Sequence, residues 1–175
     1  MGERARCPRE PTLTLTIHAA KPADVATIRS LIGELAEFER LAHEVVATEE
    51  GLHEALFGPR PAAETVLARV DGEVAGFALF YHNFSTFIGR HGLYIEDLYV
   101  RPAFRGQGVG RTLLAHLARL ATARGCGRME WSVLNWNRRA IGFYEALGAK
   151  PVNDWTIYRL DRAGFEAIQT GAAGE

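Results

Sequence analysis

The sequence predicts one α/β domain built on a mixed sheet, and three observations lead to this fold class. Segments with period-two alternation, typical of strands, are interspersed with segments whose apolar residues recur every three or four positions, typical of amphipathic helices. Some neighbouring strands are joined by a tight turn and others by a helix, so both antiparallel and parallel pairs are expected. The 175 residues, 47% hydrophobic and 23% charged, fit one domain of ordinary size.

Strands and helices alternate along most of the chain. In chain order the pattern predicts a strand over 12–17, a helix over 22–38, a short helix over 49–57, strands over 65–70, 74–81 and 93–100, a helix over 113–121, a strand over 129–134, a helix over 140–147 and a last strand over 156–160. Residues 82–92 are expected to form a loop. Residues 12–170 then make up the domain, and residues 1–11 a flexible extension.

Several boundaries have a local cause. Asp71-Gly72 predicts a tight hairpin turn, because glycine accepts the positive φ that such a turn needs. Thr48 is placed to cap the short helix, although position 51 lacks the acidic or amide side chain of a capping box. Gly125 and Gly148 are expected to end their helices.

Composition excludes several classes of protein. The formal net charge of -1 lacks the basic field of a dedicated nucleic-acid-binding domain, and no apolar run is long enough to cross a membrane. Cys7 and Cys126 make neither a disulfide framework nor a metal site. The first residues are polar and do not resemble a secretory signal, so we expect a cytoplasmic protein.

The segment Arg105-Gly-Gln-Gly-Val-Gly110 stands between a predicted strand and a predicted helix. Glycines there let the backbone approach a ligand closely, and the N-terminus of a helix attracts pyrophosphate. The spacing is not that of a Rossmann turn, and no Gly-Lys-Ser/Thr follows as in a P-loop. The alternative interpretation is a tight strand-to-helix turn without a ligand.

Arg105-x-x-Gly108-x-Gly110 resembles the acyl-CoA motif of the GNAT superfamily of N-acetyltransferases, and the stretch from Asn135 to Gly148 resembles the second half of that family's site. The resemblance covers about residues 15–160. Residues 34–39, 81–89 and 93–97 are similar to the diamine (spermidine/spermine) acetyltransferase branch and its thialysine-acetylating relatives. The resemblance implies a mostly antiparallel central sheet flanked by helices, with its fourth and fifth strands splayed apart.

The resemblance also implies acetyl-CoA as co-substrate, no metal, and a set of cofactor contacts. Pantetheine would lie beside the fourth strand, pyrophosphate on the following loop, and a further contact would come from downstream. The residues that match these positions are Leu98, Val100, Arg105, Gly106, Gln107, Gly108, Gly110, Arg111 and Asn137.

Two residues match the family's catalytic positions. Tyr144 would protonate the departing thiolate, and Glu96 would accept the proton of the attacking amine through a water. The alternatives are that Tyr144 is a core residue and that His82 or His91 is the base. Glu39, Asp97 and Trp155 match substrate-binding positions of the branch, although a solvated carboxylate is the alternative for Glu39. Because Glu96 and Asp97 are adjacent in a strand, their side chains are expected on opposite faces, and we favour Glu96 as the base.

The sequence thus predicts an N-acetyltransferase that acts on a primary amine of a small molecule, either a diamine, a polyamine or a lysine-like amino acid. Glu145 and Ala146 replace basic residues of the branch, and Arg40 adds a positive charge beside Glu39, which favours a smaller or differently charged amine than spermidine. The alternatives are acetylation of a protein N-terminus or lysine, and a non-catalytic acyl-CoA-binding protein. The resemblance implies a homodimer, to which residues 152–160 can contribute.

Overall fold

The computed structural model describes residues 13–171. Two compact units are recognised, which meet in the sequence between Leu134 and Asn135, and each is described by itself. The expected flexible extension over residues 1–11 lies outside the described residues.

The first unit contains a five-stranded sheet in the order β1-β2-β3-β4-β5. Its elements are β1 (Leu15–Ala19), α1 (Val25–Glu39), α2 (Glu49–Phe57), β2 (Glu64–Val70), β3 (Glu73–Ser85), β4 (Arg90–Val100), α3 (Val109–Ala123) and β5 (Arg128–Trp131), with 3-10 turns at Pro22–Asp24, Ala42–Glu44 and Pro102–Phe104. The first four strands pair antiparallel, and β5 pairs parallel to β4. The predicted mixed, mostly antiparallel sheet flanked by helices is confirmed.

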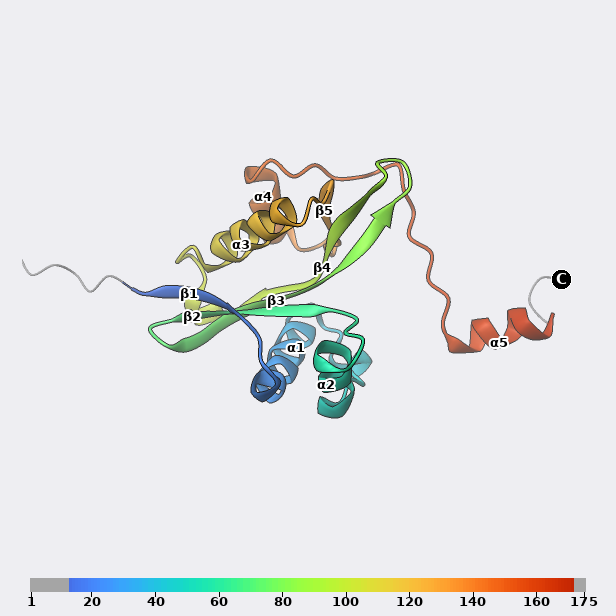
Figure 1. Ribbon diagram of the computed structural model, residues 1–175, viewed down its shortest axis with the longest axis horizontal. Helices are drawn as coiled ribbons and strands as arrows, with labels where there is room; N and C mark the ends of the chain where they lie inside the picture. Colours follow the sequence, from blue (N-terminus) through green and yellow to red (C-terminus); the bar gives the residue numbers. More distant parts are fainter. Residues whose placement is uncertain (1–12, 172–175) are drawn as a thin grey trace, which may run out of the picture. The chain divides into compact units, whose positions relative to one another are not determined.

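Helices cover both faces of this sheet, α1 and α2 on one and α3 on the other (Figure 1). On the first face, Phe77 of β3 and Tyr99 of β4 pack in a buried cluster with Ile28 and Leu31 of α1. On α3, Leu113 and Leu117 have no exposed surface. The apolar stripes that predicted α1 and α3 are therefore the surfaces that bind the helices to the sheet.

The predicted caps and turns are present. The Thr48 hydroxyl accepts a hydrogen bond from the Gly51 N–H at 3.1 Å, so a single cap begins α2 without a capping box. In the β2–β3 turn, Asp71 and Gly72 have φ values of 49° and 85°. Both lie in the left-handed region that a two-residue hairpin turn requires.

The β3–β4 hairpin is longer than the sequence predicts. Residues 82–92 were expected to be a loop, but β3 continues to Ser85 and β4 starts at Arg90. Asn83 pairs with Gly92 in this extension. Because asparagine and glycine are both poor strand formers, the sequence of this segment does not show the alternating pattern of a strand. Gly92 fits because a Cβ there would collide with the Asn83 side chain.

The second unit contains α4 (Arg138–Ala146) and α5 (Arg162–Thr170). The predicted strand over 156–160 is wrong, since these residues pair with no strand among residues 13–171. Strand-forming side chains produce a strand only when a partner edge supplies hydrogen bonds, and Tyr158 is 92% exposed. The sequence prediction also missed α5, although Asp161 marks its start by accepting a hydrogen bond from Gly164 N at 2.8 Å.

Candidate active site

The loop before α3 has the backbone that its glycines predicted. Gly106 and Gly108 have φ values of 81° and 82°, which side chains with a Cβ rarely adopt. Thr112 N donates to Gly108 O at 2.9 Å, so residues 109–111 begin the helix and their N–H groups have no acceptor within it. The arrangement fits a pyrophosphate group. The N–H of Arg105 is used within the turn, where it donates to Pro102 O at 3.2 Å.

Beside this loop, one edge of β4 is left open. Arg101 N donates to Ala75 O at 2.9 Å, so alternate residues of β4 direct their backbone groups toward β3. Leu98 and Val100 therefore direct their N–H and C=O groups to the other side. There, β5 pairs only with Gly92–Ile95, and within residues 13–171 no strand covers the rest of β4 on that edge. An extended group with amide bonds, such as pantetheine, fits this edge.

A β-bulge interrupts β4 next to that edge. Leu79 of β3 lies opposite Asp97 and Phe80 lies opposite Ile95, which leaves Glu96 without a partner residue. Strict alternation predicted opposite faces for Glu96 and Asp97. The bulge breaks this alternation, and bulges commonly redirect a side chain beside an active site.

Two further carboxylates act on Asp97 at the bulge. Burial raises the pKa of Asp97 to about 6, and the charges of Glu96 and Glu39 add to this rise. Burial also raises the pKa of Glu39, which lies in the last turn of α1. Such a concentration of negative charge favours a cationic ligand, whose charge would lower these pKa values again.

Two tyrosines not predicted from the sequence belong to the same region. The rings of Tyr81 and Tyr94 lie 5.2 Å apart, and the Tyr94 hydroxyl is 2.9 Å from the Ser132 hydroxyl. Burial raises the pKa of Tyr81, and the charge of Glu96 raises it further. Tyr81 pairs with Tyr94, and Asp97 pairs with Leu79, which lies two residues before Tyr81 on β3, so Tyr81, Tyr94 and Asp97 lie along one face of the sheet. Alternation along β4 alone does not reveal this, because the bulge lies between Tyr94 and Asp97.

The second unit holds the remaining predicted residues. Tyr144 lies on α4 with its ring 5.4 Å from that of Phe143. Asn137 caps this helix, since its side-chain oxygen accepts a hydrogen bond from Ala140 N at 3.2 Å, and its amide nitrogen is a donor. Trp155 is 71% exposed.

Other titratable groups have structural surroundings. His82 Nε2 lies 3.4 Å from Arg124 Nη1, and Arg124 Nη2 donates to Glu64 Oε2 at 2.8 Å. His82 is therefore part of an ion-paired surface cluster, in which His91 is a ring neighbour at 6.3 Å. Among residues 13–171 no group of histidine, cysteine and carboxylate side chains is arranged to hold a metal ion. No helix in the same part of the chain is long and apolar enough to span a membrane.

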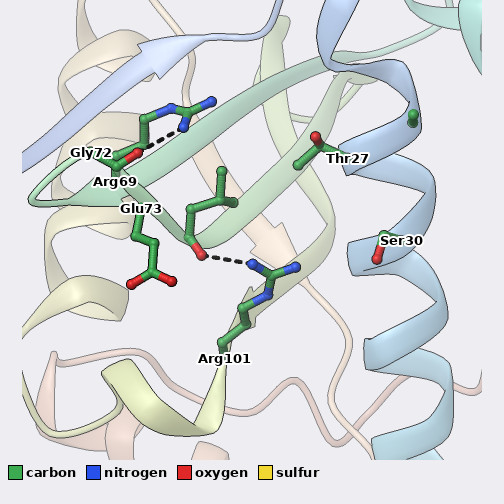
Figure 2. A pocket seen from close by; sticks show the side chains of 8 residues that line it. Thr27, Ser30, Arg69, Gly72, Glu73 and Arg101 are labelled. Atoms are coloured by element: carbon green, nitrogen blue, oxygen red, sulfur yellow. Dashed lines mark hydrogen bonds between the residues drawn. The ribbon is translucent and has the colours of Figure 1, made fainter.

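A separate hollow of about 480 Å³ lies beside α1 and the β2–β3 turn (Figure 2). It contains none of the predicted site residues. Its two arginines are already bonded to the protein, Arg69 Nη1 to Gly72 O at 2.9 Å and Arg101 Nη1 to Val74 O at 3.0 Å. The bulge and the loop before α3 are therefore the better candidate site.

Comparisons with known proteins agree with this geometry. The model of the acetyltransferase (GNAT) family matches residues 31–149. The chain belongs to the GNAT acetyltransferase family. Enzymes of this family use acetyl-CoA as co-substrate, and the chain is accordingly an N-acetyltransferase.

Its relatives include enzymes that are named for the acetylation of small molecules. A thialysine N-epsilon-acetyltransferase of Bos taurus is 38% identical over 83% of this chain and 91% of its own length. An L-ornithine N5-acetyltransferase of Arabidopsis thaliana is 34% identical over 87% of this chain and 86% of its own. The structure of an integron cassette protein of V. cholerae has a TM-score of 0.74 at 24% identity, covers 89% of this chain and 97% of its own, and confirms the fold.

Proposed function

We propose that this enzyme transfers the acetyl group of acetyl-CoA to a primary amine of a small molecule that carries a second cationic group. Diamines, polyamines and lysine-like amino acids such as thialysine and ornithine have this chemistry. The observation that carries the proposal is the carboxylate cluster at the β4 bulge, where the partly buried Asp97 lies within the influence of the charges of Glu96 and Glu39. Two relatives named for thialysine and ornithine support it.

Most of the proposed cofactor contacts come from the backbone of the first unit. Leu98 through its N–H and C=O, and Val100 through its N–H, bind pantetheine at the open β4 edge, since Val100 O already accepts a hydrogen bond from Arg105 Nε. The N–H groups of residues 106–111 bind pyrophosphate. Asn137 donates its side-chain amide to the cofactor. The positive φ values of Gly106 and Gly108 support this assignment, because they turn the loop so that consecutive N–H groups reach the mouth of α3.

Direct attack in a ternary complex needs two proton transfers. A free alkylamine has a pKa near 10, so about one molecule in a thousand is unprotonated at neutral pH. Glu96 accepts the proton that the attacking nitrogen loses, through a water, and Tyr144 gives a proton to the departing thiolate. Asp97 and Glu39 bind the second cationic group, and the Trp155 ring adds an aromatic face to it.

The exposed apolar side chains of the second unit suggest a homodimer. Val152, Trp155, Ile157 and Tyr158 are each at least 64% exposed, and a cluster of this kind favours association. A second copy is the partner we propose for residues 152–160. Sedimentation analysis tests this directly, since Ile157→Lys is expected to shift the protein toward the monomer.

The release of free thiol from acetyl-CoA tests the acceptor class. The panel holds putrescine, spermidine, lysine, thialysine, ornithine and a short peptide with a free N-terminus, with a blank that contains no acceptor. We expect turnover above the blank with one or more of the small amines and none with the peptide. Turnover with the peptide alone would favour a protein acetyltransferase. Acetyl-CoA binding without any turnover would favour a non-catalytic acyl-CoA-binding protein.

A further inference from the structure

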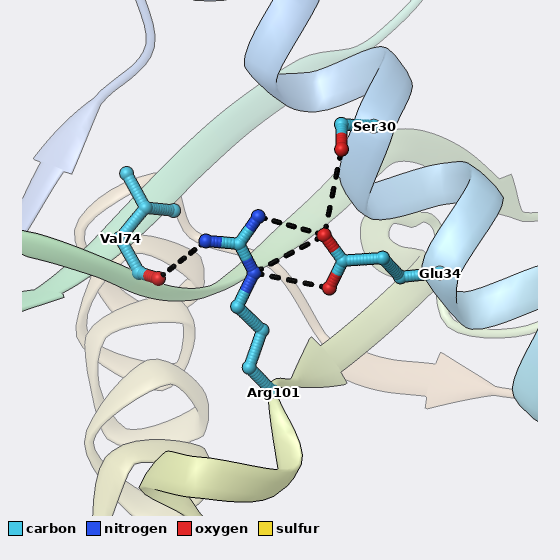
Figure 3. Close-up of polar contacts among 4 residues, drawn as sticks. All are labelled: Ser30, Glu34, Val74 and Arg101. Carbon is cyan, nitrogen blue, oxygen red and sulfur yellow. Dashed lines mark hydrogen bonds and ion pairs between the residues drawn. The ribbon is translucent and has the colours of Figure 1, made fainter.

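The connection between β4 and α3 carries two arginines four residues apart, and both side chains are bound toward α1. Arg101 makes a bidentate contact with the carboxylate of Glu34 on α1 (Figure 3), in which Nη2 donates to Oε1 at 2.7 Å and Nε donates to Oε2 at 3.0 Å. The guanidinium holds the pKa of Glu34 below its ordinary value. Two parallel hydrogen bonds of this kind fix orientation as well as distance.

Arg105 makes the second connection by other means. Its Nε donates to Val100 O at 2.8 Å, and its guanidinium carbon lies 4.8 Å from the centre of the Phe38 ring and 5.7 Å from that of Tyr99. Both distances suit a cation–π contact, which is stronger for a partly desolvated arginine than for an exposed one. Glu34 and Phe38 are one helical turn apart on α1, so the two arginines bind one face of that helix.

Both the side chain and the backbone N–H of Arg105 are bonded within the protein. The guanidinium is occupied by two rings and a carbonyl oxygen, and the N–H of Arg105 is bonded to Pro102 O. Phe38 remains 38% exposed although it is apolar, and the stack gives this ring a structural purpose. Gly106 follows Arg105 directly, so fixing Arg105 fixes the start of the phosphate loop, by which we mean residues 106–111.

We propose that Arg105 is a positioning residue that fastens the phosphate loop to the end of α1 through Phe38. The next residue after Phe38 is Glu39, whose charge acts on Asp97. One rigid connection therefore fixes the position of the phosphate loop relative to the carboxylates proposed to bind the acceptor. This inference rests on the proposed function for what the two sites bind.

A double-mutant cycle on acetyl-CoA binding tests the proposal without turnover. The dissociation constant is measured by equilibrium titration for the wild type, Arg105→Lys, Phe38→Leu and the double variant. Lysine keeps the positive charge but loses the planar group and the Nε bond, whereas leucine keeps apolar volume without a ring. We expect each single variant to bind about three- to tenfold more weakly, and the double variant to bind no more weakly than Arg105→Lys alone.

A conservative substitution of Phe38 and a control substitution on α1 distinguish a positioning role from a general loss of structure. Phe38→Tyr keeps the aromatic face and is expected to bind acetyl-CoA within about twofold of the wild type. Ile32→Leu, a change of similar size on α1, serves as the matched control and is expected to have no effect on binding. In kinetics, Arg105→Lys is expected to raise the KM values of both acetyl-CoA and the amine more than it lowers kcat.

Three results would overturn the proposal. If Arg105→Lys binds as tightly as the wild type, the charge alone is what matters and Arg105 is a direct phosphate ligand. If the losses of Arg105→Lys and Phe38→Leu add fully, the stack does not couple them. If the wild type itself fails to bind acetyl-CoA, the proposed function falls as well, whereas binding without acceptor turnover leaves this inference intact and removes only the acceptor assignment.

Discussion

Replacing Asp97 with asparagine is expected to stabilise the ligand-free protein in a pH-dependent way. The pKa of this carboxyl rises from 3.8 to about 6 on folding, chiefly through burial. Between these values the folded state binds more protons at Asp97 than the unfolded state, so the stability of the wild type falls as pH rises through this window. Above about pH 6 the penalty is complete. At about 1.4 kcal/mol for each pH unit, it amounts to about 3 kcal/mol.

The comparison of two pH values isolates this penalty. Urea unfolding followed by tryptophan fluorescence gives the difference in unfolding free energy between Asp97→Asn and the wild type at about pH 8 and about pH 4. At about pH 4 most of the penalty is absent, because Asp97 is then protonated in the folded state and partly protonated in the unfolded state. Any constant cost of placing an amide there cancels, so the benefit of the substitution should be about 2 kcal/mol larger at the higher pH.

A matched control guards against general charge effects. Glu37→Gln removes an exposed carboxylate on the same helix as Glu39 and is expected to change stability by less than about 0.5 kcal/mol at both pH values. An equal effect of Asp97→Asn at both pH values would refute the account, because the pKa of Asp97 would then not be raised by partial burial and neighbouring like charges.

The remaining predictions concern the cofactor loop and the catalytic groups. Glu39→Gln removes one charge that raises the pKa of Asp97. The limb of the kcat/KM profile that rises as Asp97 loses its proton should therefore move to lower pH. A limb that does not move would show that the charge of Glu39 does not act on Asp97. Gly108→Ala forces a Cβ into a φ of 82° and should cost about 1 to 2 kcal/mol of stability and weaken acetyl-CoA binding, as urea unfolding and titration would show; unchanged binding would argue against the phosphate loop. Tyr144→Phe should keep acetyl-CoA affinity and lower kcat at least about tenfold, and full turnover would remove Tyr144 from the mechanism.

The sequence predicted the sheet and its helices well because their signals are local. Apolar side chains at helical spacing predicted α1 and α3, and the same side chains form the buried contacts with the sheet. Asp71-Gly72 and the glycines at 106 and 108 predicted backbone conformations that depend on the residue itself. The failed strand over 156–160 shows the limit, because a strand depends on a partner edge that the sequence does not name.

The site was predicted in its composition but not in its geometry. Glu39, Glu96 and Asp97 were all predicted from the resemblance, yet the bulge that breaks the alternation of β4 appears only in the pairing of β3 with β4. The contact between Arg105 and Phe38 is equally invisible in the sequence, since it joins residues far apart in the chain. The motif matched Arg105 to the cofactor-binding loop, and the fold places its side chain against the Phe38 ring of α1.

The central claim is that the carboxylates at the β4 bulge bind a second cationic group of the acceptor. The most direct measurement is the ratio of kcat/KM for ornithine to that for 5-aminopentanoate, which has the same reacting amine and lacks the second ammonium group. We expect a ratio of at least about ten in the wild type, corresponding to about 1.4 kcal/mol, and a clear fall of this ratio in Glu39→Gln. Equal values for the two amines, together with turnover, would contradict the claim and leave the carboxylates without a role in choosing the acceptor.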